Sequence, residues 1–234
     1  MSAPLPLGPI AAGTNRYRPG EAVRAVRAAW TEGGPVLFDT AEVYGLGRSE
    51  RALAGEPLVA TKVMPHPWRR PSSVADALDA SLARLQASSV RLCLLHFPVE
   101  VRDNSAWIRE LAALVHSGRA EGIGVSNHDL GQLREAWRVA GEEGVTLEVV
   151  QAEYNSGQRS VEAEILPFCR EHGVLFQASR PLDGGRLDAR ESIGWLLERG
   201  VQPIVGTLDP EHARAALAWA ADLGGETTVE RNGE

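Results

Sequence analysis

Four side chains whose types could together transfer a proton lie near the ends of apolar segments: Asp39, Tyr44, Lys62 and His96. A phenol has a pKa of about 10 and is a weak acid at neutral pH. A nearby ammonium favours the phenolate and lowers that pKa, and a carboxylate beside the ammonium keeps the ammonium charged. An imidazole can meanwhile hold a carbonyl oxygen that the phenol protonates. These residues therefore indicate acid–base chemistry on a carbonyl group, provided that the fold brings them together.

Lys62 is the only lysine among the 24 basic residues, since all the others are arginines. A drift toward arginine replaces lysines that serve only as surface charge. An ammonium is more compact than a guanidinium, and its pKa shifts more readily in a buried site. The retention of Lys62 therefore favours a site that needs an ammonium, with chance survival as the alternative.

Short β-rich segments alternate with amphipathic helical patterns along the chain. We expect strands at 7–13, 35–41, 57–62, 90–96, 121–126, 147–152, 173–179 and 202–206, and helices at 20–32, 48–54, 72–86, 104–117, 129–141, 160–171, 189–199 and 209–222. Eight such units with short connections predict an α/β fold, a compact (β/α)8 TIM barrel that spans residues 1–234 as a single domain. The alternative is an open doubly wound sheet, which usually begins with a glycine-rich phosphate loop. Residues 13–17 do not have the sequence of such a loop.

Residues typical of helix ends support several of these boundaries. Asp129, Ser160 and Asp209 directly precede or begin helical segments and are predicted N-caps. Pro210 suits the first position of a helix, where its missing N–H has no partner to lose.

Alternate residues of each strand in a parallel barrel point into the lumen. On this pattern Asp39, Lys62 and His96 take the last inward positions of three consecutive predicted strands. Tyr44 lies in the loop that follows the first of these strands. Barrel enzymes place their active sites at this C-terminal end of the strands. A single polar residue at a strand end is more often structural, but four at a common depth favour a catalytic group.

The composition limits the classes of partner. The formal net charge is −7 and the chain has no basic stripe, so we expect no nucleic-acid partner. No apolar run approaches the roughly 18 residues of a membrane span, and the first residues lack the features of a signal peptide. Cys93 and Cys169 lie in apolar segments and indicate reduced core thiols of a cytoplasmic protein. The histidines lack metal-ligand spacing, so no metal site is predicted.

Taken together, five segments resemble the aldo-keto reductase superfamily, and the resemblance covers nearly the whole chain. They are residues 38–50, 60–62, 94–98, 118–127 and 151–154. The resemblance implies that Tyr44 is the acid, that Lys62 and Asp39 tune it, and that His96 orients the carbonyl group.

The resemblance also implies that NADPH, or alternatively NADH, is the cofactor for the reduction of an aldehyde or ketone. Ser126, Asn127 and Gln151 would hold the nicotinamide. The residues implied along the pyrophosphate and adenosine parts are Leu182, Gly184, Arg186 and Thr207.

The chain departs from the family's pattern in several places. Family members are usually longer, and an N-terminal hairpin, a long specificity loop after the seventh strand and most of the C-terminal tail have no counterpart here. Ser179 stands where the family often has an aromatic residue against the nicotinamide. Near the expected place of the adenosine 2′-phosphate, Asp209 and Glu211 add negative charge, and Arg214 is not at the family's position. We therefore expect weak binding of NADPH with little preference over NADH.

Three functions are compatible with these residues. The first is NAD(P)H-dependent reduction of a small-molecule carbonyl compound. The second is a cofactor-independent acid–base enzyme, an isomerase, cyclase or lyase, that uses the same four residues. The third is a non-catalytic barrel subunit, against which the intact group of four argues. Binding of the cofactor distinguishes the first two, and the oligomeric state is left open.

Overall fold

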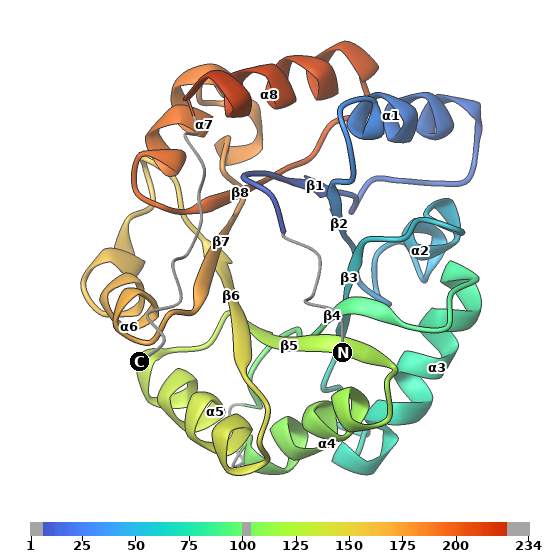
Figure 1. The fold of residues 1–234 in the computed structure, drawn as a ribbon, viewed down its shortest axis with the longest axis vertical. Helices are drawn as coiled ribbons and strands as arrows, with labels where there is room; N and C mark the ends of the chain where they lie inside the picture. Colours follow the sequence, from blue (N-terminus) through green and yellow to red (C-terminus); the bar gives the residue numbers. More distant parts are fainter. Residues whose placement is uncertain (1–6, 100–103, 224–234) are drawn as a thin grey trace.

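Parallel strands form a closed barrel in the computed structural model, which describes residues 7–99 and 104–223 (Figure 1). Each strand pairs with its neighbours in the sequence, and the barrel closes where Ala11 of the first strand lies opposite Ile204 of the last. The strands are β1 (Ala11–Gly13), β2 (Leu37–Asp39), β3 (Val59–Val63), β4 (Val90–Leu95), β5 (Ala120–Ser126), β6 (Leu147–Glu153), β7 (Leu175–Ser179) and β8 (Gln202–Val205). The predicted (β/α)8 barrel is confirmed.

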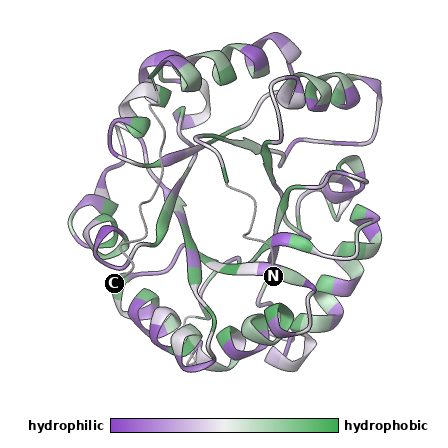
Figure 2. Ribbon diagram, in the orientation of Figure 1, coloured by the Kyte–Doolittle hydropathy of each residue, from purple (hydrophilic) through white to green (hydrophobic). Residues whose placement is uncertain are grey.

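Helices alternate with the strands and surround the barrel (Figure 1). They are α1 (Glu21–Thr31), α2 (Arg48–Ala52), α3 (Val74–Leu85), α4 (Ser105–His116), α5 (Leu130–Glu142), α6 (Ile165–Glu171), α7 (Ala189–Leu197) and α8 (Pro210–Leu223). Figure 2 shows strands that are mainly apolar and helices that carry both apolar and polar residues. This pattern is expected for helices that pack one face on the barrel and turn the other to water.

The lumen of the barrel is largely filled by apolar side chains. The inward positions predicted on β2, β3 and β4 are confirmed, because Leu37, Leu58, Ala60, Leu92 and Leu94 belong to one buried cluster. A larger buried cluster joins the outer faces of the strands to the helices. The interior is thus a packed core and not a pore, as in other barrels of this type. Polar side chains at inward positions are exceptions in this core and mark candidates for function.

Two of the predicted N-caps are confirmed. Asp129 forms a capping box with Gln132 at the start of α5. The Asp209 carboxylate accepts a hydrogen bond from the Glu211 N–H at 2.9 Å, and α8 begins at Pro210. Both carboxylates therefore satisfy N–H groups that the first turn of a helix leaves unpaired.

Helix α6 begins later than predicted. Ser160–Glu162 forms a separate 3-10 turn, and α6 starts at Ile165. Pro167 explains the difference, because a proline fits the first turn of a helix but removes a hydrogen bond and clashes in the interior. A helix that began at Ser160 would place Pro167 in its interior.

Strands β1 and β2 are shorter than predicted, with three residues each. Before β1, Gly8 has a φ of 71° and Pro9 has no N–H, so the chain does not join the strand ladder until Ala11. Pro35 likewise lacks a donor before β2.

The expected lack of an N-terminal hairpin concerns residues that lie partly outside the described ones. Residues 1–6 are not described, and residues 7–10 form no strand. The connection from β7 to α7 covers only residues 180–188, in agreement with a short loop. Among the described residues, no helix is both long and apolar enough to cross a membrane.

Candidate active site

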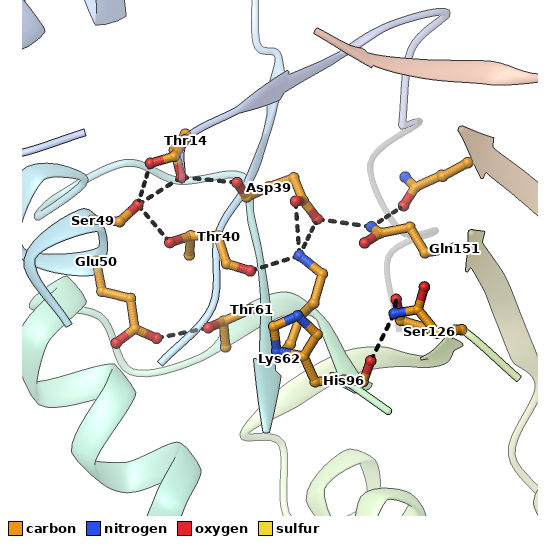
Figure 3. Close-up of polar contacts among 12 residues, drawn as sticks. Thr14, Asp39, Thr40, Ser49, Glu50, Thr61, Lys62, His96, Ser126 and Gln151 are labelled. Carbon is orange, nitrogen blue, oxygen red and sulfur yellow. Dashed lines mark hydrogen bonds and ion pairs between the residues drawn. The ribbon is translucent and has the colours of Figure 1, made fainter. Parts of the chain in front are cut away.

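The Lys62 ammonium is bound to Asp39 at the C-terminal end of the barrel. Lys62 is 1% exposed, and its Nζ donates to both Asp39 oxygens at 2.7 Å and to the Thr40 carbonyl at 2.8 Å (Figure 3). Burial by itself lowers the pKa of Lys62, but the Asp39 charge and the nearby Tyr44 raise the pKa above its ordinary value of 10.5. Lys62 is therefore charged at neutral pH, and Asp39 balances this charge.

The Tyr44 ring lies next to this ion pair. The Lys62 Nζ is 5.1 Å from the ring centroid, and the ring meets His96 edge-on at a centroid distance of 5.7 Å. The Lys62 charge lowers the pKa of Tyr44, but burial and the Asp39 charge raise it, and the pKa lies above its ordinary value of 10.0. The expected net lowering of this pKa is therefore wrong. The phenol keeps its proton at neutral pH and is able to donate it.

Two buried side chains of α2, Ser49 and Glu50, fix the loop that carries Tyr44. Ser49 Oγ bonds to two threonine hydroxyls, and Glu50 accepts from a third threonine (Figure 3). Glu50 also accepts from an arginine. These partners are Thr14 (2.7 Å), Thr40 (2.8 Å), Thr61 (2.6 Å) and Arg84 (2.5 Å). A turn of three left-handed residues, 45–47, joins Tyr44 to α2. The phenol is thus positioned by a short turn between two anchored elements.

Two buried histidines, His96 and His128, are neutral at pH 7. Burial and, to a smaller extent, the Lys62 charge lower the pKa of His96 to about 3. Burial also lowers the pKa of His128 to about 4, although its ring Nδ1 bonds to the Ser126 carbonyl at 2.9 Å. His96 can therefore hold a carbonyl oxygen through a neutral N–H without adding a charge to the site.

We expect the free energy of unfolding to fall as the pH decreases from about 6.5 toward 4. Unfolded histidines bind a proton in this range, whereas folded His96 and His128 do not, so each contributes a slope of roughly 1 kcal/mol per pH unit. His128→Asn should remove one contribution to the slope, because asparagine does not bind a proton in this pH range. Its side-chain N–H can still donate to the Ser126 carbonyl. Urea unfolding at about pH 7 and pH 5 measures the slope, with His212→Asn at an exposed position as the control. An unchanged slope in His128→Asn would contradict the burial of a neutral imidazole.

A cavity of about 600 Å³ opens at this end of the barrel, which is a common size for a small-molecule site. Of the residues predicted for the site, it is lined by Asp39, Tyr44, His96, Ser126, Asn127, Gln151, Leu182 and Gly184. Lys62 is not among the lining residues; it is buried and contacts two of them, Asp39 and Tyr44. The sequence motifs did not identify several further lining residues, among them Asn15, Arg16 and Arg180.

Three polar side chains on one wall of the cavity leave a defined set of hydrogen-bonding atoms unpaired. Asn127 Nδ2 donates to the His96 carbonyl at 3.1 Å and to Ser126 Oγ at 3.0 Å. Gln151 Nε2 donates to two acceptors inside the barrel, at 2.8 and 2.9 Å. Within the described part of the chain, the two amide oxygens and the Ser126 hydroxyl proton have no protein partner. The wall therefore presents two acceptors and one donor to the cavity.

Comparison with known proteins identifies the family. The model of the aldo/keto reductase family matches residues 4–194. The chain belongs to the aldo/keto reductase family. Aflatoxin B1 aldehyde reductase member 2 of Mus musculus is 31% identical over 243 residues, which cover 82% of this chain and 65% of the relative. Methylglyoxal reductase of Escherichia coli is 30% identical over 219 residues, which cover 89% of this chain and 73% of the relative. This family member thus spans slightly less than two thirds of the mouse protein's length.

Solved structures of aldo/keto reductases have the same fold. An aldo/keto reductase of Klebsiella pneumoniae in complex with NADP and acetate superimposes with a TM-score of 0.79 at 25% identity, over 93% of this chain and 87% of that chain. The thermostable aldo-keto reductase Tm1743 in complex with epalrestat has a TM-score of 0.78 at 26% identity, over 93% and 90% of the two chains. The resemblance inferred from the sequence motifs is confirmed.

Two residues expected at the cofactor lie outside the wall of the cavity in this aldo/keto reductase. Arg186 is exposed, and its guanidinium is bound to both oxygens of Asp183 at 2.8 Å. Thr207 is buried, and its hydroxyl accepts from the Asp209 N–H at 3.0 Å. A residue of the same loop therefore engages each side chain, and the sequence motifs do not show these local contacts.

Gln177 of β7 and Gln202 of β8 belong to the polar interior of this barrel, although the family motifs do not include them. Each lies two residues from an apolar side chain of the lumen, Leu175 or Ile204. A polar amide at an inward position of an otherwise apolar strand is the sequence signal that identifies them.

Proposed function

We propose that the protein reduces an aldehyde or ketone to an alcohol with NADPH or NADH. The observation that carries the proposal is the set of unpaired atoms on the cavity wall near Tyr44. A primary carboxamide, the polar group of nicotinamide, has one accepting oxygen and two donating N–H groups. The Ser126 hydroxyl matches the oxygen, and Asn127 Oδ1 and Gln151 Oε1 match the two N–H groups. The residues present therefore fit the nicotinamide end of the cofactor.

Membership of the family supports the same class of cofactor. Two solved structures of similar fold show aldo/keto reductase from Klebsiella pneumoniae in complex with NADP or NADPH. Two relatives are named as reductases of aldehydes, aflatoxin B1 aldehyde reductase and methylglyoxal reductase. Small aldehydes are therefore the first substrates to test.

The side chains of the cavity supply the proton and orient the substrate. The cofactor, when bound, supplies the hydride. The Tyr44 hydroxyl is protonated at neutral pH and donates to the carbonyl oxygen. Lys62 stabilises the phenolate that remains, because its charge lies beside the ring and Asp39 holds it there. Neutral His96 borders the same cavity and holds the carbonyl oxygen with a hydrogen bond.

We expect NADPH to bind with little preference over NADH. Arg214 of α8 is engaged by Glu32 at 2.5 Å and by Glu211 at 2.6 Å, so its guanidinium is not free for a 2′-phosphate. The loss of one charged contact to a phosphate removes about 1.5–3 kcal/mol, which is about one to two decades of affinity. Titrations of nicotinamide fluorescence with each nucleotide measure the two Kd values. The Escherichia coli methylglyoxal reductase, titrated in parallel, provides the reference affinity.

Two outcomes of this titration would change the proposal. A Kd for NADPH more than about tenfold lower than for NADH would show that other residues bind the 2′-phosphate. Binding of neither nucleotide, in a protein that still converts methylglyoxal, would support the cofactor-independent acid–base enzyme instead.

A further inference from the structure

We infer that Gln177 and Gln202 are positioning residues that fix the Gln151 amide with its oxygen toward the cavity. The inference rests on the proposed function, because this oxygen is one of the two acceptors assigned to the nicotinamide carboxamide. Neither Gln177 nor Gln202 lines the cavity. Both therefore act through Gln151 and touch neither cofactor nor substrate.

The three glutamines form a continuous chain of amides through the lumen. Gln151 Nε2 donates to Gln177 Oε1 at 2.9 Å, and Gln177 Nε2 donates to Gln202 Oε1 at 2.5 Å. Gln202 Nε2 then donates to the carbonyls of Leu7 and Gly8 at 2.8 and 2.6 Å. Each glutamine is 3% exposed or less. This amide relay runs from β6 over β7 and β8 to the segment that precedes β1.

The orientation of each amide in the relay is determined, because the groups at both ends of the relay accept hydrogen bonds and cannot donate them. At one end, Asp39 Oδ1 accepts from Gln151 Nε2 at 2.8 Å, and a carboxylate has no proton to donate (Figure 3). At the other end, two backbone carbonyls require the nitrogen of Gln202. The oxygen of Gln202 then faces the nitrogen of Gln177, and the oxygen of Gln177 faces the nitrogen of Gln151. Both N–H groups of Gln151 are used, so its oxygen is the atom left for the cavity.

A role in the stability of the barrel alone is the competing explanation for the relay. Removal of Gln177 leaves buried polar atoms on Gln151 and Gln202 without partners and lowers the stability in either case. Only the positioning role also predicts that the Gln151 amide becomes mobile, because Asp39 alone then holds it and the freed N–H group can turn toward water in the cavity. The two roles differ in what they predict for cofactor affinity.

Three variants separate the two roles. Gln177→Met removes the acceptor for Gln151, and we expect the Kd of NADPH to rise about tenfold. Gln177→Glu keeps an accepting oxygen toward Gln151, and its buried carboxyl, when protonated, also donates to Gln202 Oε1 as the amide did, so we expect a Kd close to that of the wild type. In a Gln151→Met background, Gln177→Met should not change the Kd, because the residue acts only through Gln151. Urea unfolding of the same variants measures their free energies of unfolding, and we expect the changes in Kd not to follow the changes in stability.

Leu92→Met is the matched control for repacking of the lumen. Leu92 lies in the apolar cluster of the lumen, on β4, and its replacement should lower the stability without changing the Kd. If Gln177→Met does not fold, Gln202→Met tests the relay one step further away, and we expect a smaller rise in Kd. An equal rise in Leu92→Met overturns the inference, and so does a rise from Gln177→Met in the Gln151→Met background.

Hydrogen exchange of the Gln151 side-chain NH2 group distinguishes this inference from the proposed function. Its NMR signals are those that disappear in Gln151→Met, and we expect slow exchange in the wild type and in Gln177→Glu but fast exchange in Gln177→Met. If the wild type binds neither nucleotide and this pattern holds, the proposed function fails and the positioning of Gln151 stands. If exchange stays slow in Gln177→Met, the inference is overturned whatever nucleotide the protein binds.

Discussion

Tyr44→Phe should lower kcat for the reduction of an aldehyde by roughly two to four orders of magnitude in a protein that stays folded. A general acid contributes about this factor, and the Tyr44 phenol is the proton-bearing group beside Lys62 and His96. Phenylalanine keeps the edge-on contact with His96, so the free energy of unfolding should change by about 1 kcal/mol or less. Steady-state kinetics with methylglyoxal and NADPH, together with urea unfolding, measure the two effects.

The affinity for NADPH is the internal control for this variant. The Tyr44 hydroxyl is not among the atoms assigned to the carboxamide, so the Kd should equal that of the wild type. Activity near the wild-type level would show that another group donates the proton. A large loss of stability would show that the hydroxyl holds the loop and not the substrate.

Lys62→Met should abolish activity and lower the free energy of unfolding by about 3–5 kcal/mol. The variant leaves the Asp39 carboxylate buried without its counter-charge, since the Lys62–Asp39 pair is almost inaccessible to water. Adding Asp39→Asn should recover part of the stability, because the double variant buries neutral side chains only. It should not recover activity, because no ammonium remains to stabilise the phenolate. Urea unfolding and the same kinetic assay measure both results.

An exposed ion pair provides the reference for this loss of stability. Arg138→Ala removes the exposed pair with Glu142 and should cost no more than about 0.5 kcal/mol. A similarly small cost for Lys62→Met would contradict the burial of the Lys62–Asp39 pair. A further loss on addition of Asp39→Asn would show that Asp39 stabilises the barrel through its other contacts.

The catalytic end of the barrel could be predicted from the sequence because one local rule decides it. Alternation along a strand places Lys62 in the lumen above Leu58 and Ala60, and the structure agrees. The same rule places Gln177 and Gln202 in the lumen, but it does not reveal what they bind. Their partners lie 25 to 195 residues away in the sequence, so only the closed barrel brings the amides together.

The pKa of Tyr44 and the place of Arg186 depend on tertiary structure in a way that the motifs do not report. A motif shows which charges lie near the phenol. The pKa of Tyr44 also depends on how deeply the folded chain buries the ring beside Lys62 and Asp39, and the motif does not show this. Arg186 lies in a segment that predicts contact with a phosphate. Asp183, three residues earlier, binds its guanidinium instead.

The solitary lysine also determines how this protein responds to amine-directed chemistry. Lys62 is the only lysine of the chain, and it is 1% exposed. Reagents that acylate side-chain amines need an accessible, unprotonated nitrogen, whereas the Lys62 ammonium is charged and bound to Asp39. Acylation of lysine therefore takes place only in molecules whose barrel has opened. The rate of Lys62 acylation therefore measures how often the catalytic end of the barrel opens.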